Sequence, residues 1–193
     1  FRHRNTLGAS IRFDGSDLFG VDKKYRYLPL YSVSGLWRIS SESFMSDIEW
    51  INNLAIRASY GLQGNIDKST SPKILGNYTT TTILPGTTED AIDIASPPNE
   101  KLRWEKTHSS NIGFDFSVLN TRINLSGDYY YRKGVDLIGS QALALETGFQ
   151  STTINWASMK NQGVEFSLNT HNIKTKHFDW RTTFNIAYNQ NKI

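Results

Sequence analysis

The stretch NIGFDFSVLNTRINLSGDYYYRK, residues 111–133, decides the fold class. In its first half Ile112, Phe114 and Phe116 alternate with small or charged residues, and after the polar tetrapeptide LNTR the alternation resumes at Ile123. Successive side chains of a β-strand point to opposite faces, so this period of two predicts two strands, each with one apolar face. The short polar break between them predicts a β-hairpin.

The same alternation recurs on both sides of this hairpin. It predicts further strands near residues 6–13, 31–39, 53–61, 162–171 and 178–190. The total is about seven strands, several of about 10–13 residues, which is longer than the 5–6 residues usual in soluble sheets. A tilted membrane strand needs about 9–11 residues, so the predicted fold class is all-β, an antiparallel segment of a transmembrane β-barrel.

The connections between these strands alternate in length. The long ones cover residues 14–30, 62–105 and 134–161, and the short ones cover 119–122 and 172–177. Outer-membrane barrels alternate long extracellular loops with short periplasmic turns in this way. Residues 40–52 belong on the short side and are expected to hold a helical turn that begins at Ser40 or Ser41.

Composition narrows the class of protein further. No run approaches the ~18 apolar residues of a membrane-spanning helix, and a mean hydropathy of -0.46 fits a barrel whose apolar residues alternate with polar ones. The 21 basic and 18 acidic residues are interspersed, so no nucleic-acid partner is predicted, and KKYRY at 23–27 is interpreted as a solvated loop. The absence of cysteine excludes a disulfide scaffold and a cysteine nucleophile.

Charged residues opposite the apolar stripe are the candidates for contact with a substrate. They are Asp115, Asp128, Arg132, Glu165 and Arg181, and the alternation predicts that they line the barrel interior. Paired carboxylates also serve glycoside cleavage, but the barrel interpretation explains their facing without catalysis. No catalytic residue, metal site or cofactor is predicted.

Two histidine-containing segments are candidates for metal binding or nucleophilic catalysis. His171 and His177 flank a short turn and are interpreted as solvated, because no carboxylate completes a metal-ligand set. His108 precedes Ser109 and Ser110 in an alternating strand, where neighbours point to opposite faces and no acid is placed to orient a nucleophile.

Aromatic residues near strand ends suit the interfacial girdles of a membrane barrel, where an apolar ring carries a polar tip. The predicted girdle residues are Trp37, Tyr60, Trp104, Tyr129, Tyr131, Trp180 and Tyr188. Aromatics are enriched in all strands, so the alternative is that they are core or hairpin residues of a soluble β protein.

Several segments, in order along the chain, resemble the SusC/RagA family of TonB-dependent outer-membrane transporters. They are RFDGSDLFG (12–20), LYSVSGLWRISSESFM (30–45), LAIRASYGLQGN (54–65), PPNEKLRWEKTHSSNIGFDFSVLNTRINLSGDYYYRKGVDLI (97–138), TGFQ with NWASMKNQGVEFSL (within 147–168) and FDWRTTFNIAYNQNKI (178–193). Asp17 and Ala157 depart from the family pattern without disturbing the alternation, and they leave the cargo undetermined.

The resemblance implies a large barrel of about 22 strands in the outer membrane of a Gram-negative bacterium. It also implies a plug region that couples to TonB, a SusD-like surface lipoprotein as partner, outer-membrane lipids as surroundings, and oligosaccharide or peptide cargo. Residues 1–193 are then expected to be a partial barrel domain that lacks the plug and the remaining strands. Two alternatives stay open, a soluble β-sandwich that binds carbohydrate and an outer-membrane barrel that is not a transporter.

Overall fold

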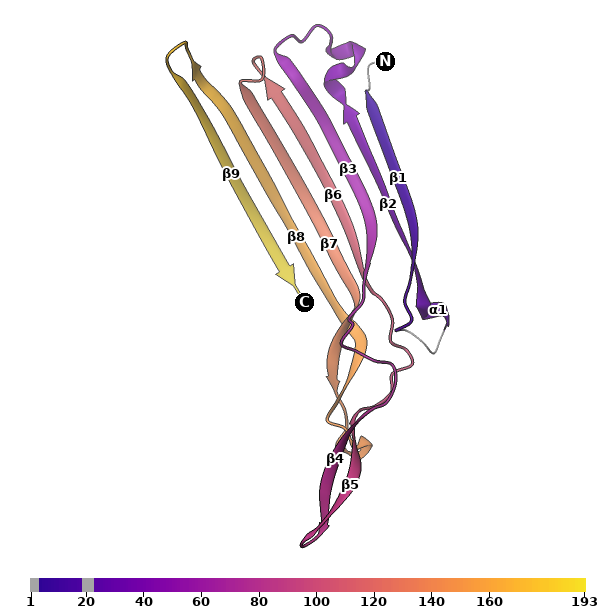
Figure 1. Ribbon diagram of the computed structural model, residues 1–193. Coiled ribbons are helices and arrows are strands. Elements are labelled where there is room, and N and C mark those ends of the chain that lie inside the picture. The colour runs from indigo at the N-terminus through magenta and orange to yellow at the C-terminus, as the bar shows by residue number, and fades with distance from the viewer. Residues whose placement is uncertain (1–3, 19–22) are drawn as a thin grey trace.

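The chain forms one curved antiparallel sheet of seven strands and a separate two-stranded hairpin in the computed structural model, which describes residues 4–18 and 23–193 (Figure 1). The large sheet contains β1 (Asn5–Gly15), β2 (Tyr27–Arg38), β3 (Ile51–Asn65), β6 (Glu105–Val118), β7 (Ile123–Ala142), β8 (Ser151–Lys174) and β9 (Asp179–Lys192). Its strands are neighbours in the order β1-β2-β3-β6-β7-β8-β9, and each pair is antiparallel. The predicted fold class and the seven strands are confirmed.

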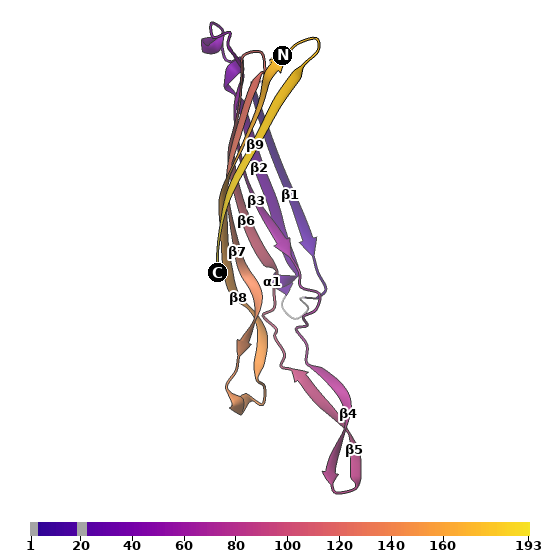
Figure 2. The ribbon, with the colours of Figure 1, turned by 90° about the vertical axis from the view of Figure 1, so that its left-hand side faces the viewer.

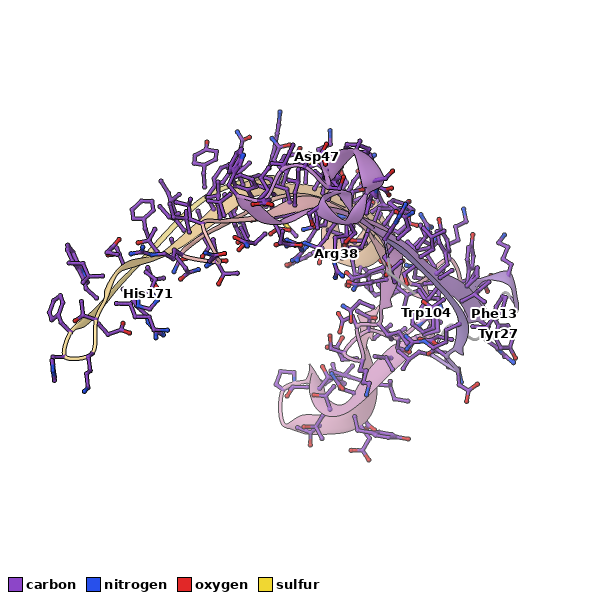
Figure 3. All side chains as sticks on the ribbon, turned by 90° about the horizontal axis from the view of Figure 1, so that it is seen from above. Phe13, Tyr27, Arg38, Asp47, Trp104 and His171 are labelled. Atoms are coloured by element: carbon purple, nitrogen blue, oxygen red, sulfur yellow. The ribbon has the colours of Figure 1, made fainter. Side chains whose placement is uncertain are left out.

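The sheet is a single curved layer. Figure 2 shows it nearly edge-on, and Figure 3, which looks along the strands, shows an open arc with a convex and a concave side. A β-sandwich would need a second sheet packed face to face on this one. The hairpin strands β4 and β5 pair only with each other and extend beyond one end of the sheet.

The predicted long connection at 134–161 is wrong, because β7 and β8 run through most of it. They have 20 and 24 residues and are joined by 143–150, which contains the short helix η3 (Leu145–Thr147). A register shift between Gly134 and Leu137 places Asp136 in the left-handed region at φ 57°. Such a bulge breaks the alternation and bends the strand, which is why the pattern hides the continuation of β7.

The connection between β3 and β6 contains a hairpin that the sequence analysis did not predict. Its strands are β4 (Leu75–Leu84) and β5 (Thr87–Ser96). Pro85 and Gly86 join them, with Gly86 at φ 83°. Pro followed by Gly in this conformation suits a type II turn, and the threonine-rich flanks favour strands.

The remaining connections follow the predicted alternation of length only in part, because the β2–β3 connection at 39–50 is as long as the β1–β2 connection at 16–26. The turn at 119–122 is confirmed, and the β8–β9 turn follows Lys174. Two short 3-10 helices, η1 (Ile39–Ser41) and η2 (Ser43–Met45), confirm the helical turn expected between β2 and β3. The segment KKYRY, interpreted as a loop, contains the one-turn helix α1 (Lys23–Arg26).

The helical β2–β3 connection and the two tight turns after β6 and β8 lie at one end of the sheet, and the hairpin β4–β5 and the β7–β8 extension lie at the other, long-connection end (Figure 1). Within residues 4–18 and 23–193, no helix is long and apolar enough to cross a membrane.

Candidate functional site

The convex side of the sheet carries an apolar band. Strand pairing aligns apolar residues of β6, β7, β8 and β9 in rows on this side. One row is Phe116, Leu125, Leu168 and Phe184, the next is Phe114, Gly127, Phe166 and Ile186, and the third is Ile112, Tyr129, Val164 and Tyr188. Large side chains here are exposed, for example Ile112 at 58% and Phe184 at 56%. A contiguous exposed apolar face of this extent indicates that an apolar medium or a partner covers it.

The concave side carries charge instead. Arg57 of β3 lies between two carboxylates, with its Nε 2.8 Å from Asp115 and its Nη2 3.1 Å from Asp128. All three side chains remain partly exposed, at 26–37%. Glu165 stands directly opposite Asp128 in the β7–β8 register. The structure thus places Asp115, Asp128 and Glu165 close together on the predicted face.

Arg57 is the member of this cluster that the sequence analysis missed. The alternation of the sequence does predict its face, because Arg57 lies between Ile56 and Ala58 and therefore points away from the apolar stripe. It neutralises part of the repulsion between Asp115 and Asp128, which are diagonal neighbours across the β6–β7 pair because Asp128 stands opposite Gly113 and Asp115 opposite Ser126.

The other two predicted interior residues lie on the same side but away from this cluster. The guanidinium of Arg132 lies 5.5 Å from the ring centre of Tyr130, within cation–π distance. Arg181 pairs with His171 in the β8–β9 register and forms an ion pair of 3.1 Å with Asp179 near the β8–β9 turn. Any contact of these residues with a substrate stays a prediction.

Six of the seven predicted girdle aromatics share the register face of the apolar band. They are Trp37, Tyr60, Tyr129, Tyr131, Trp180 and Tyr188. Trp37 and Trp180 lie next to short connections, at the ends of β2 and β9. Figure 3 shows the two-sided arrangement at the β1–β2 edge, where Phe13 and Tyr27 lie on the convex side and Arg38 on the concave side.

Trp104 differs from the other six, and its assignment to the girdle is corrected here. Its side chain is 6% exposed and packs with Leu28, Leu30 and Leu102 in a small buried cluster, on the concave side of the sheet (Figure 3). The indole Nε1 donates to the backbone oxygen of Arg26 at 3.4 Å. Trp104 therefore anchors the segment before β6 instead of meeting the membrane interface.

A second charged cluster fixes the end of β6 to the β7 bulge. Asp136 accepts hydrogen bonds from Arg103 Nη2 at 2.7 Å and from Lys106 Nζ at 3.2 Å. Asn155, 9% exposed, donates to the backbone oxygens of Arg103 and Asp136, both at 2.7 Å, and accepts from the Arg103 amide at 2.9 Å. The hydrogen bond that Arg103 donates to the Asp136 carboxylate is the main reason that the pKa of Arg103 is raised.

This Asp136 cluster was not predicted, although its residues lie in the segments RWEK, GVDL and NWASMK. Asp tolerates the left-handed conformation better than most residues, and here its carboxylate also binds two cations. The cluster holds the connection before β6 against β7 and β8, so it shapes the end of the sheet where the long connections gather.

The described residues offer no arrangement for catalysis or metal binding. No group of three or more His, Asp, Glu or Cys side chains in that part of the chain is placed to hold a metal ion. His108 Nδ1 lies 2.7 Å from the Tyr60 hydroxyl. Ser109 and Ser110 pair with different residues of β3 on opposite faces, so they form no nucleophile pair with His108.

A one-layer antiparallel arc with an apolar convex face and a charged concave face defines a section of the wall of a transmembrane β-barrel. The family described as TonB dependent receptor-like, beta-barrel, matches residues 2–192. The chain belongs to this family, whose members are receptors and transporters of the outer membrane and not enzymes.

Comparison with similar proteins supports the assignment of the chain to this family. The chain is 39% identical to TonB-dependent receptor P26 of Formosa agariphila and 35% identical to TonB-dependent receptor SusC of Bacteroides thetaiotaomicron, over 100% and 99% of its length. The solved structure of the RagAB peptide importer in the closed-closed state matches 99% of the chain with a TM-score of 0.83 and 27% identity. The chain spans about a fifth of the length of these relatives, 19% of each receptor and 20% of the solved chain.

Proposed function

We propose that this chain is part of the barrel wall of a TonB-dependent importer in the outer membrane of a Gram-negative bacterium. The observation that carries the proposal is the separation of side chains in the seven-stranded sheet. The apolar rows on the convex side suit lipid, and the charged residues on the concave side suit a water-filled interior. Because the chain belongs to the TonB-dependent receptor family, TonB is the proposed energy source for transport. The coupling to TonB would run through a plug region elsewhere in the protein.

The proposed cargo is an oligomeric nutrient, a glycan or peptide fragment. The solved RagAB structure is described as a peptide importer, which supports the peptide class. The glycan class rests on the resemblance to the SusC/RagA family. Polar cargo of either class needs hydrogen-bonding and charged groups along its path. Asp128, Glu165 and Arg132 are the proposed contacts from this section of wall, because they lie on the concave face.

A SusD-like surface lipoprotein is the proposed partner. The support is the pair of relatives and the shape of the long-connection end. There the hairpin β4–β5 extends beyond the sheet, and β7 and β8 continue past the bulge at Asp136. Exposed residues of the hairpin include Tyr78 at 90% and Ile83 at 67%. Exposed aromatic and aliphatic side chains at such an end suit a protein partner.

The test uses the intact parent protein in its native host. Uptake of labelled oligosaccharides and labelled peptides is measured in the wild type, in a deletion strain and in a strain depleted of TonB. Uptake of at least one cargo class should disappear in the deletion strain, return on complementation, and disappear again when TonB is depleted or a protonophore is added. Uptake that persists without TonB would contradict the proposal. A complementing protein that is recovered from the soluble fraction would also contradict it.

A further inference from the structure

The convex side carries a row of basic residues beyond its apolar band. His108 of β6 is directly opposite Lys133 of β7, Lys133 is opposite Lys160 of β8, and Lys160 is opposite Lys192 of β9. Residues opposite each other in an antiparallel sheet share a face and have Cβ atoms about 4.5–5.5 Å apart. The three lysines therefore stand side by side on three neighbouring strands, and all three are exposed.

Their position relative to the apolar band is fixed by the register. The last apolar row contains Ile112 and Tyr129, the next row contains Tyr131 and Gln162, and the lysine row follows. Four residues of strand separate the lysines from the last apolar row, about 13 Å along the strand. With a strand tilt of about 35–45° this is about 10 Å of height, the depth of lipid headgroups beside a hydrocarbon layer.

Within residues 4–18 and 23–193, no acidic side chain pairs with the lysine row. None of Lys133, Lys160 and Lys192 forms an ion pair with another residue in the part of the chain that the structure describes. By register, the carboxylates of Asp115, Asp128 and Glu165 lie on the opposite, concave face. Like charges directly opposite each other in a sheet are destabilising, so the row is stabilised if an anion lies over it.

We infer that Lys133, Lys160 and Lys192 bind the phosphate group of a lipid in the membrane leaflet on the long-connection side, which is the outer leaflet in the proposed orientation. A lipid fits better than a free anion, because the apolar rows begin on the same face beyond the row of Tyr131 and Gln162, about 13 Å along the strands, where they can contact its acyl chains. This inference rests on the membrane placement in the proposed function. It adds a lipid site outside the barrel that is separate from any cargo site on the concave face.

The test measures binding of monophosphoryl lipid A to the purified, detergent-solubilised parent protein by native mass spectrometry. The same measurement is made with lipid A from which the phosphate has been removed. The main variant replaces all three residues, Lys133→Gln, Lys160→Gln and Lys192→Gln. Lys160→Gln alone is a second variant that keeps the test valid if the triple variant assembles poorly, because it removes only the central charge.

The matched control removes three exposed lysines from the connection between β3 and β6, Lys68→Gln, Lys73→Gln and Lys101→Gln. It changes the net charge by the same amount on the same protein. Each lysine near a lipid surface strengthens anion binding by about fivefold, so the triple variant should bind the phosphorylated lipid about a hundredfold more weakly. The control and wild type should bind it equally, and both should bind the dephosphorylated lipid as weakly as the triple variant does.

Three results would overturn the inference. They are unchanged affinity in the triple and single variants, an equal loss in the loop control, and displacement of the lipid by millimolar inorganic phosphate, which would indicate a free-anion site. The assay reads binding to purified protein, so it is independent of cargo uptake. Uptake that does not depend on TonB would contradict the proposed function, but the lipid-binding measurement would still be interpretable. The triple variant should retain normal uptake.

Discussion

Replacing Phe166 by arginine tests, at one position, whether the convex face of the sheet meets lipid. Phe166 lies in the middle apolar row, opposite Gly127 and Ile186, and its side chain is 44% exposed. Its ring centre is 6.5 Å from that of Phe114. Its Cε1 atom lies so close to Gly127 that a Cβ added there would be only 2.9 Å away, so the ring packs directly over the glycine. Arginine near the bilayer midplane costs about 2–4 kcal/mol, and loss of the aromatic pair adds about 0.5–1.5 kcal/mol. We expect Phe166→Arg to destabilise the intact barrel by about 3–5 kcal/mol.

The matched control is Ser167→Arg, one residue further along β8 and on the concave face opposite Ser126. In a water-filled interior this arginine should cost less than about 1 kcal/mol. The assay is the yield of heat-modifiable folded protein in the outer membrane, followed by urea unfolding of barrels refolded in lipid vesicles. Equal loss of stability in the two variants would refute the facing assignment, and a larger loss for Ser167→Arg would reverse it.

Three further predictions test the clusters and the orientation. Arg57→Gln leaves two neighbouring carboxylates, Asp115 and Asp128, without their shared cation on the concave side, and because these groups are partly exposed the unfolding free energy should fall by only about 1–2 kcal/mol, measured by urea unfolding. Asp136→Ala removes two ion pairs and puts alanine into a left-handed conformation that costs about 1–2 kcal/mol, so hydrogen exchange should rise in the segment before β6 and stay unchanged at the β6–β7 turn. An epitope inserted near Thr81 should be labelled by antibody on whole cells, whereas one near Asn120 should be labelled only after permeabilisation, and the opposite pattern would invert the proposed topology.

The fold was predictable wherever alternation was unbroken. Residues 111–133 predicted the β6–β7 hairpin because each apolar residue had a polar neighbour and the break at LNTR was short. Prediction failed where the register shifts. At Asp136 the bulge disrupts the period of two, so the outer parts of β7 and β8 were interpreted as a connection. The hairpin β4–β5 was missed because the run of four threonines at 79–82 interrupts the apolar alternation of β4, although Tyr78, Ile92 and Ile94 share one face.

The sequence predicts on which face of the sheet the candidate site residues lie, but it does not predict which residues contact one another. Alternation alone puts Asp115 and Asp128 on one face, but it does not show that Arg57, far away in sequence, lies between them. That contact depends on β3 and β6 being neighbours across the long connection. Trp104 was misassigned for the same reason, because its burial depends on Leu28 and Leu30 of β2.

Single cysteines placed at residues 112 to 117 of β6 test most directly whether the two faces of the sheet meet lipid and water, since residues 1–193 contain no cysteine of their own. Any cysteine elsewhere in the intact protein is first replaced by serine. Each would carry a fluorophore in the intact protein, reconstituted once in vesicles with brominated acyl chains and once with a water-soluble quencher. A barrel wall predicts alternation with a period of two, so that brominated lipid quenches positions 112, 114 and 116 and the aqueous quencher acts at 113, 115 and 117. Quenching of all six positions by the aqueous reagent, with no response to brominated lipid, would contradict the account.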